Sequence, residues 1–113
     1  MNFYGLKNCD TCRIAMKELD AAGIAYAYID VRADGVPAGT LSGWIDQMGA
    51  DKLVNRRSTT WRNLTEAEKA SAEDNAKLLS LLQANPTLIK RPVIEQGAGI
   101  YVGWQEYVQS RNF

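Results

Sequence analysis

The feature that most constrains the fold is a strand–helix–strand pattern over residues 2–31. Residues 2–6 are aromatic and apolar, which is typical of a short buried strand. Apolar residues then recur at helical spacing over residues 10–22, and Gly23 follows with the left-handed conformation that ends many helices. Residues 24–31 favour a second strand. Because a helical crossover places the two strands that it joins parallel, the chain is predicted to open with a parallel pair.

The pattern changes to that of helices after residue 34 and returns to strands only near the end. The predicted helices span 40–48, about 73–83 and about 105–111, with a capping box at 65–68, and the predicted strands span 92–95 and 100–102. The two late strands flank a glycine-rich turn, which favours an antiparallel hairpin. Together, these elements predict an α/β, thioredoxin-like fold with a mixed four-stranded sheet in a single domain, 1–113. A helical insertion at about 37–87 separates the two halves of the sheet in the sequence.

Composition narrows the classes of function. The 13 Lys and Arg residues balance the 13 Asp and Glu residues, so no direct nucleic-acid binding is expected. No apolar run approaches the roughly 20 residues of a membrane span, and the N-terminus lacks the features of a signal peptide. We therefore expect a cytoplasmic protein with no membrane partner. Without His, mechanisms that use a histidine base are excluded, and thiols are the expected reactive groups.

The sharpest chemical signal is Cys9-Asp10-Thr11-Cys12, a C-x-x-C motif at the turn between the first strand and the first helix. Here Cys9 faces free backbone amides and the positive end of the helix dipole, which stabilise a thiolate. A thiolate attacks disulfides, and Cys12, one helical turn later, can attack the mixed disulfide and release the product. The motif predicts a redox-active pair, with Cys9 as nucleophile and Cys12 as resolving thiol.

Two other interpretations of the cysteines stay open. Both thiols can be buried and inert, as free cysteines often are. They can also form half of a metal site that a dimer shares, since a closed zinc site would need more ligands than this chain's two thiols. The position of the motif at a strand-to-helix turn favours the redox interpretation. No metal and no tightly bound cofactor are therefore predicted.

Two further segments carry weaker signals. Pro92 enters a strand, and a cis bond there would leave backbone groups free to pair with an extended thiol substrate. Alternatively, Pro92 opens an edge strand and Arg91 is a solvated surface residue. Arg56, Arg57 and Arg62, with hydroxyl residues between them, can hold an oxyanion or a carboxylate. The other interpretation of the arginines is a positively charged loop.

Residues 4–11, 57–61 and 89–93 closely resemble the ArsC/Spx family, and the resemblance is nearest to its YffB-type branch. It implies a thioredoxin-like fold with a helical insertion, a nucleophilic cysteine at Cys9 and a cis proline at Pro92. For YffB-type proteins a glutathione-dependent thiol reductase activity has been inferred, so glutathione is implied as a co-substrate. The residues implied in its binding are Asn8, Arg57, Arg91 and Pro92. That branch commonly has an apolar residue where this chain has Cys12.

We therefore predict a thiol–disulfide oxidoreductase that acts on a small thiol or disulfide substrate, with catalytic Cys9, Cys12 and Arg91. Two alternatives come with the resemblance. Spx-type regulators carry the same C-x-x-C as a redox switch and bind RNA polymerase, which makes the polymerase α subunit the expected partner. Arsenate reductases resemble the chain at Cys9 and Arg91, but Asn55 stands where another of their arginines is expected.

Overall fold

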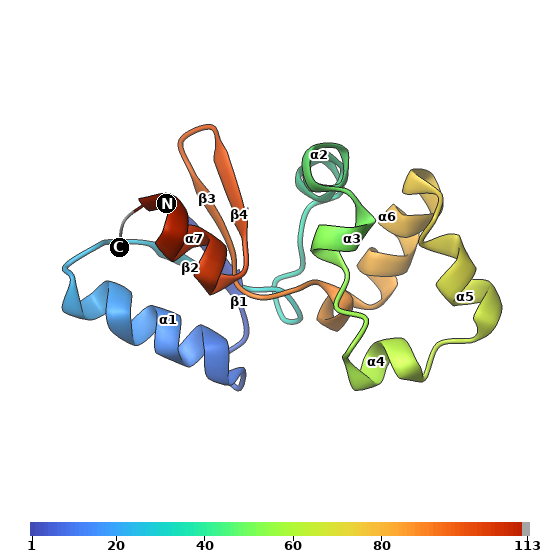
Figure 1. Cartoon of the computed structure of the whole chain (residues 1–113), viewed down its shortest axis with the longest axis horizontal. Helices are drawn as coiled ribbons and strands as arrows, with labels where there is room; N and C mark the ends of the chain where they lie inside the picture. Colours follow the sequence, from blue (N-terminus) through green and yellow to red (C-terminus); the bar gives the residue numbers. More distant parts are fainter. Residues whose placement is uncertain (112–113) are drawn as a thin grey trace. The chain divides into compact units, whose positions relative to one another are not determined.

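The computed structural model describes residues 1–111, and of residue 111 the backbone alone. One sheet contains β1 (Asn2–Gly5), β2 (Ala27–Asp30), β3 (Val93–Gln96) and β4 (Gly99–Val102) in the order β2-β1-β3-β4. β1 is parallel to β2 and antiparallel to β3, and β4 is antiparallel to β3. The predicted mixed sheet, its parallel first pair and its late hairpin are confirmed (Figure 1).

The helices are α1 (Asp10–Ala21), α2 (Ala38–Met48), α3 (Ala50–Leu53), α4 (Thr59–Arg62), α5 (Glu66–Ser71), α6 (Asn75–Ala84) and α7 (Trp104–Arg111), with a 3-10 turn η1 (Pro86–Leu88). The chain divides into two compact units. We call residues 1–34 and 91–113 the sheet unit and residues 35–90 the helical unit. The insertion predicted at 37–87 lies inside the helical unit, and the single domain stays a prediction.

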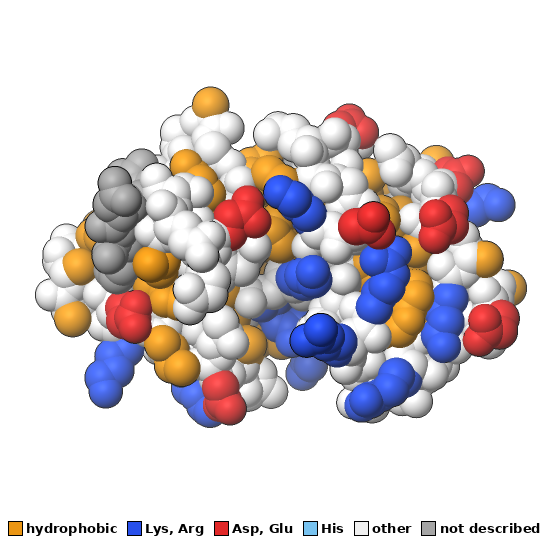
Figure 2. Space-filling model, in the orientation of Figure 1, with side chains coloured by type: hydrophobic (Ala, Val, Ile, Leu, Met, Phe, Trp, Pro, Cys, Tyr) orange, Lys and Arg blue, Asp and Glu red, His pale blue; other side chains and the backbone are white. Residues whose placement is uncertain are grey.

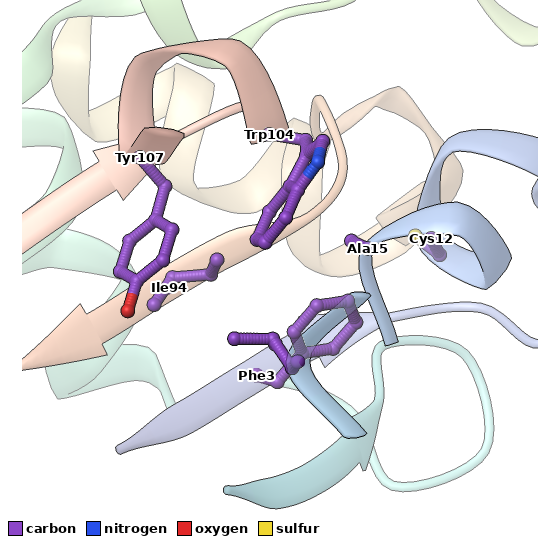
Figure 3. Close-up of a cluster of buried hydrophobic side chains, with 7 residues drawn as sticks. Phe3, Cys12, Ala15, Ile94, Trp104 and Tyr107 are labelled. Carbon is purple, nitrogen blue, oxygen red and sulfur yellow. The ribbon is translucent and has the colours of Figure 1, made fainter. Parts of the chain in front are cut away.

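The core of the sheet unit lies on one face of the sheet, under α1 and α7. Its buried side chains are Phe3, Cys12, Ala15, Leu19, Ile94, Trp104 and Tyr107 (Figure 3). Phe3 and Ile94 are partners in the register of β1 and β3, so both point to this face. The Trp104 ring stacks on Tyr107 at 5.4 Å between centroids, and its Nε1 donates to the carboxylate of Glu18 at 3.1 Å. This bond ties α7 to α1, the helix that begins at the C-x-x-C motif.

The helical unit is packed mainly with aliphatic side chains. Leu41 and Ile45 of α2 and Leu78, Leu81 and Leu82 of α6 are buried. The helix predicted over about 73–83 begins at Asn75, and its first turn, including Ala76, is exposed. Figure 2 shows Lys and Arg side chains interspersed with acidic ones on the part of the surface that this unit forms. No single-sign patch dominates that view, in keeping with the balanced charge.

Three local differences from the predicted elements matter for the site. β2 is shorter than the predicted strand, because residues 24–26 precede the paired register. The edge-strand interpretation of Pro92 is wrong, since β3 lies between β1 and β4. In the arginine segment, Arg56 and Arg57 lie in a turn, and Arg62 lies in the short helix α4, which Ser58 caps. Among the described residues, no helix has both the length and the apolar character that crossing a membrane requires.

Candidate active site

Cys9 is the N-cap residue of α1, at the end of the turn that leaves β1. Its backbone is extended (φ −95°, ψ 122°), its amide donates to the carbonyl of Leu6 at 3.2 Å, and its own carbonyl accepts the amide of Arg13 at 2.9 Å. These bonds hold the Cys9 side chain at the first turn of the helix, where backbone amides have no helical acceptor. The predicted position of the nucleophile at a helix start is therefore observed.

The surroundings of Cys9 lower its pKa. Partial burial alone raises the pKa of this half-buried thiol, but four influences outweigh it: the amide of Cys12, the Cys12 thiol, and the hydrogen bond and positive charge of Arg91. The sulfur makes no cap hydrogen bond of standard geometry, so the Cys12 amide acts on it at longer range. Each of these groups favours the thiolate, which is the reactive form.

Cys12 has the opposite character. Its side chain is fully buried, with 0% exposure, and burial raises its pKa well above the ordinary range. The negative charge of Cys9 and the hydrogen bond between the two thiols raise it further, and the Leu6 amide and Arg91 offset this only in part. The motif therefore places a thiol whose pKa is lowered beside one whose pKa is raised to about 12.

A glycine makes room for the buried thiol. A Cβ on Gly5 would lie 2.8 Å from Sγ of Cys12 and 2.9 Å from the ring of Phe3. Any larger residue would displace the sulfur or the ring, so Gly5 lets the Cys12 thiol rest directly on β1. The sequence analysis missed this residue. A glycine at the end of a buried strand, directly before a C-x-x-C turn, is the signal that indicates it.

Arg91 and Pro92 join this site from the other end of the chain. The Arg91–Pro92 peptide bond is cis, as predicted, and the Pro92 carbonyl accepts the amide of Gly103 at 2.8 Å. Pro92 is buried at the start of β3, while the side chain of Arg91 hydrogen-bonds Cys9. Asn8 is exposed in the turn directly before Cys9. The sheet unit thus contains both thiols together with Arg91, Pro92 and Asn8.

The remaining predicted arginines lie in the helical unit. Arg57 is exposed, and its amide donates to the side chain of Asn55 at 3.1 Å. Its predicted role in glutathione binding stays a prediction. Arg56 bonds Asp51 at 3.0 Å and lies 5.3 Å from the centre of the Trp61 ring. These contacts give the Arg56 side chain partners within its own unit.

No metal centre accompanies the thiols in the described part of the chain. There, no group of three or more Cys, Asp or Glu side chains is arranged to hold an ion. Two cysteines alone supply half of a tetrahedral thiolate site. As thiolates, the two cysteines can attack a disulfide or another soft electrophile.

Comparisons with known proteins place the chain in a family. The profile of the ArsC family matches residues 4–109. The chain belongs to the ArsC family. An uncharacterized protein of Haemophilus influenzae is 48% identical to this ArsC-family chain over 103 residues, 91% of this chain and 90% of that protein. The global transcriptional regulator Spx of Staphylococcus aureus is 26% identical over 102 residues, 88% of this chain and 76% of Spx.

Two solved structures have the same fold as this ArsC-family chain. The YFFB (PA3664) protein matches with a TM-score of 0.89 and 38% identity, over 97% of this chain and 96% of its own. A possible arsenate reductase from Streptococcus mutans matches with a TM-score of 0.83 and 27% identity, over 99% of this chain and 97% of its own. The predicted thioredoxin-like α/β fold and the resemblance to the ArsC/Spx family, including its YffB-type branch, are confirmed.

Proposed function

We propose that this ArsC-family protein is a thiol–disulfide reductase with Cys9 as nucleophile and Cys12 as resolving thiol. The observation that carries the proposal is the arrangement at the start of α1. There the half-buried Cys9 sulfur receives hydrogen bonds from the Cys12 thiol and from Arg91, while Cys12 itself is fully buried. An inert structural pair would not need a guanidinium on one sulfur, because a cation stabilises only the thiolate.

The reaction proceeds by two exchange steps. The Cys9 thiolate attacks one sulfur of a substrate disulfide, forming a Cys9 mixed disulfide and releasing one substrate thiolate. This bond removes the negative charge on Cys9 that helps to keep Cys12 protonated. The Cys12 proton passes to the substrate thiolate released first, and the Cys12 thiolate attacks the Cys9 sulfur, which forms the Cys9–Cys12 disulfide and releases the second substrate thiolate. Two electrons pass from the protein dithiol to the substrate.

Glutathione is the proposed reductant that restores the dithiol. One glutathione thiolate opens the Cys9–Cys12 disulfide and binds Cys9, and a second one attacks that mixed disulfide and leaves as glutathione disulfide. Arg91 orients the anionic tripeptide, with Asn8 and Pro92 beside the sulfur. A cytoplasmic location fits this proposal, because glutathione keeps thiols reduced there.

Trapping of the mixed disulfide tests the proposal. Reduced Cys12→Ser protein treated with glutathione disulfide is expected to gain one glutathione, mapped to Cys9 by peptide mass spectrometry. The matched Cys9→Ser protein is expected to gain none under the same conditions, because its remaining thiol is buried and has a raised pKa. Equal modification of the two variants would contradict the assigned roles.

The likeness to Spx supports a second candidate, a redox-sensing regulator without enzymatic turnover. In that case the Cys9–Cys12 pair is a switch, and the partner is the α subunit of RNA polymerase. The candidate predicts a complex with purified α subunit whose affinity changes when the two cysteines are oxidised. Absence of such a complex in either redox state would exclude it.

The likeness to a possible arsenate reductase supports a third candidate, reduction of an oxyanion at Cys9. Arg91 is the one cation that hydrogen-bonds the Cys9 sulfur among the contacts described here. The candidate predicts that arsenate drives oxidation of glutathione or of the Cys9–Cys12 pair, and that Cys9→Ser abolishes this. No arsenate-dependent thiol oxidation by wild-type protein would exclude it.

A further inference from the structure

A pocket lies beside the turn that carries Cys9, in the sheet unit. Its volume is about 260 Å³, and it is lined by Leu6, Lys7, Asn8, Asp30, Arg32 and Ala33. Sites for whole small molecules usually measure about 300–1,000 Å³, so this pocket suits one end of a ligand. Leu6 and Asn8 belong to the turn before Cys9, and the Leu6 carbonyl accepts the Cys9 amide at 3.2 Å. A group bound here would therefore lie next to the turn that carries Cys9.

The pocket carries two cations on separate segments. Lys7 comes from the turn after β1, and its Nζ lies 5.4 Å from the centre of the Tyr28 ring. Arg32 comes from the turn after β2. Both side chains are exposed, so they can meet a ligand from solvent. Lys7 and Arg32 both line this small pocket, and cationic side chains favour a carboxylate, which accepts charge-assisted hydrogen bonds.

The acidic residue in the lining is already engaged. One carboxylate oxygen of Asp30 accepts the amides of Arg32 and Ala33, each at 2.8 Å, and the Asp30 amide donates to Asp34 at 3.0 Å. The Ala33 amide, the Arg32 amide and the charges of Arg32 and Lys7 together hold the pKa of Asp30 below its ordinary value. Asp30 thus stays ionised and fixes the turn on which Arg32 is carried.

We propose that this pocket binds a carboxylate of the thiol peptide that reacts at Cys9, with Lys7 and Arg32 as its cationic ligands. The inference rests on the proposed reductase function and deepens it by naming the substrate class: a peptide thiol or disulfide with a terminal carboxylate, of which glutathione is an example. Neutral disulfides react at the same sulfur and leave the pocket unused.

The rate at which Cys9 is thiolated in a single turnover tests whether the pocket binds a carboxylate, separately from the reactivity of the Cys9 sulfur. In Cys12→Ser protein, the rate at which Cys9 is modified is measured with glutathione disulfide and with 2-hydroxyethyl disulfide, which has no charge. The readout is the ratio of the two rate constants. Arg32→Ala in this background is expected to lower the ratio about tenfold, which corresponds to about 1.4 kcal/mol, because it removes a charge-assisted hydrogen bond to the carboxylate. The Arg32 amide, and hence its bond to Asp30, is kept.

Lys17→Ala is the matched control, because it removes the same charge from an exposed position of α1 outside the pocket. The ratio for this variant is expected to equal that of the parent. The proposed carboxylate site would be contradicted if Arg32→Ala had the same ratio as the parent. It would also be contradicted if Arg32→Ala and Lys17→Ala lowered the ratio equally. Either result would leave the reductase proposal unaffected. If the parent reacts with neither disulfide faster than free cysteine, both proposals fail.

Discussion

Side-chain oxygens cap the first turns of α5 and α6 in the helical unit, whereas no side chain caps the first turn of α1 in the sheet unit. At α5, the Thr65 hydroxyl accepts the amide of Glu68 at 3.1 Å, and the Glu68 carboxylate accepts the Thr65 amide at 2.9 Å. At α6, the carboxylate of Asp74 accepts the amides of Ala76 and Lys77 at 2.9 and 3.3 Å. At α1, the capping position is Cys9, and its sulfur makes no cap hydrogen bond.

The difference separates a stabilising helix start from a reactive one. An oxygen cap satisfies first-turn amides permanently and typically contributes about 1 kcal/mol. A sulfur cap leaves the same amides available to a thiolate, whose charge they stabilise in competition with burial. The caps of α5 and α6 therefore serve stability, and α1 lacks such a cap at the position where the Cys9 sulfur lies. Four substitutions test this contrast.

Cys9→Ser is expected to have the largest effect on activity. Serine is a better N-cap than cysteine, so the thermal midpoint should stay the same or rise slightly. A serine hydroxyl is not ionised near neutral pH and cannot attack a disulfide, so reductase activity should fall to the uncatalysed background. A disulfide-reduction assay and a thermal melt on the same sample measure both. Retained activity in this variant would show that Cys9 is not the nucleophile.

Gly5→Ala is expected to disturb the support beneath the motif. The added Cβ would approach the sulfur of Cys12 and the ring of Phe3 to under 3.0 Å, and overpacking of this kind costs about 1–3 kcal/mol of unfolding free energy. Displacement of Cys12 should also slow the resolving step. Gly43→Ala is the matched control, because a Cβ at that position of α2 meets no atom within 4 Å. Equal stabilities for the two variants would contradict the close packing of Gly5.

Arg91→Ala is expected to raise the pKa of Cys9, since it removes a hydrogen bond and a positive charge that both lower that pKa. At a fixed pH below the new pKa, a smaller fraction of Cys9 is thiolate, and alkylation should slow by about tenfold, or about 1.4 kcal/mol. The measurement is the alkylation rate of reduced protein as a function of pH. Arg13→Ala, which removes a cation bonded to Asp10, serves as control and should leave the profile in place.

Asp74→Ala is expected to have the smallest effect, confined to stability. Losing an N-cap carboxylate typically costs about 1 kcal/mol, and reductase activity should be unchanged. Asp74→Asn keeps a capping oxygen and should recover most of the loss in a denaturant-unfolding experiment. A fall in activity at full stability would contradict the assignment of this helix start to a purely structural role.

The sequence predicted the helices whose periodicity, cap or end is encoded by neighbouring residues. The apolar spacing over residues 10–22 and Gly23 predicted α1, and the Thr65–Glu68 capping box is present as expected. The short helices α3 and α4 were not predicted, because a helix of four residues has too few turns to show a periodic pattern. The start of α6 was predicted at about residue 73, two residues before Asn75, because the period of the apolar residues does not mark the exact residue at which a helix begins.

Only part of the candidate active site could be predicted from the sequence. The C-x-x-C motif at a strand-to-helix turn was sufficient to predict where Cys9 lies. The hydrogen bond from Arg91, which is 82 positions away in the chain (91 minus 9), needed the antiparallel pairing of β3 with β1. The pocket with Lys7 and Arg32 needed the parallel pairing of β1 with β2, which places the turns after these two strands at the same edge of the sheet.

By itself, the sequence determined the reactive atoms and their local frame: two thiols one helical turn apart at a helix start, in a chain without histidine. The tertiary structure alone decided that these thiols differ. Burial against Gly5 keeps Cys12 protonated, and Arg91 favours the Cys9 thiolate. The physical reason is that pKa values depend on desolvation and on charges brought close in space, and neither quantity is encoded in the order of neighbouring residues.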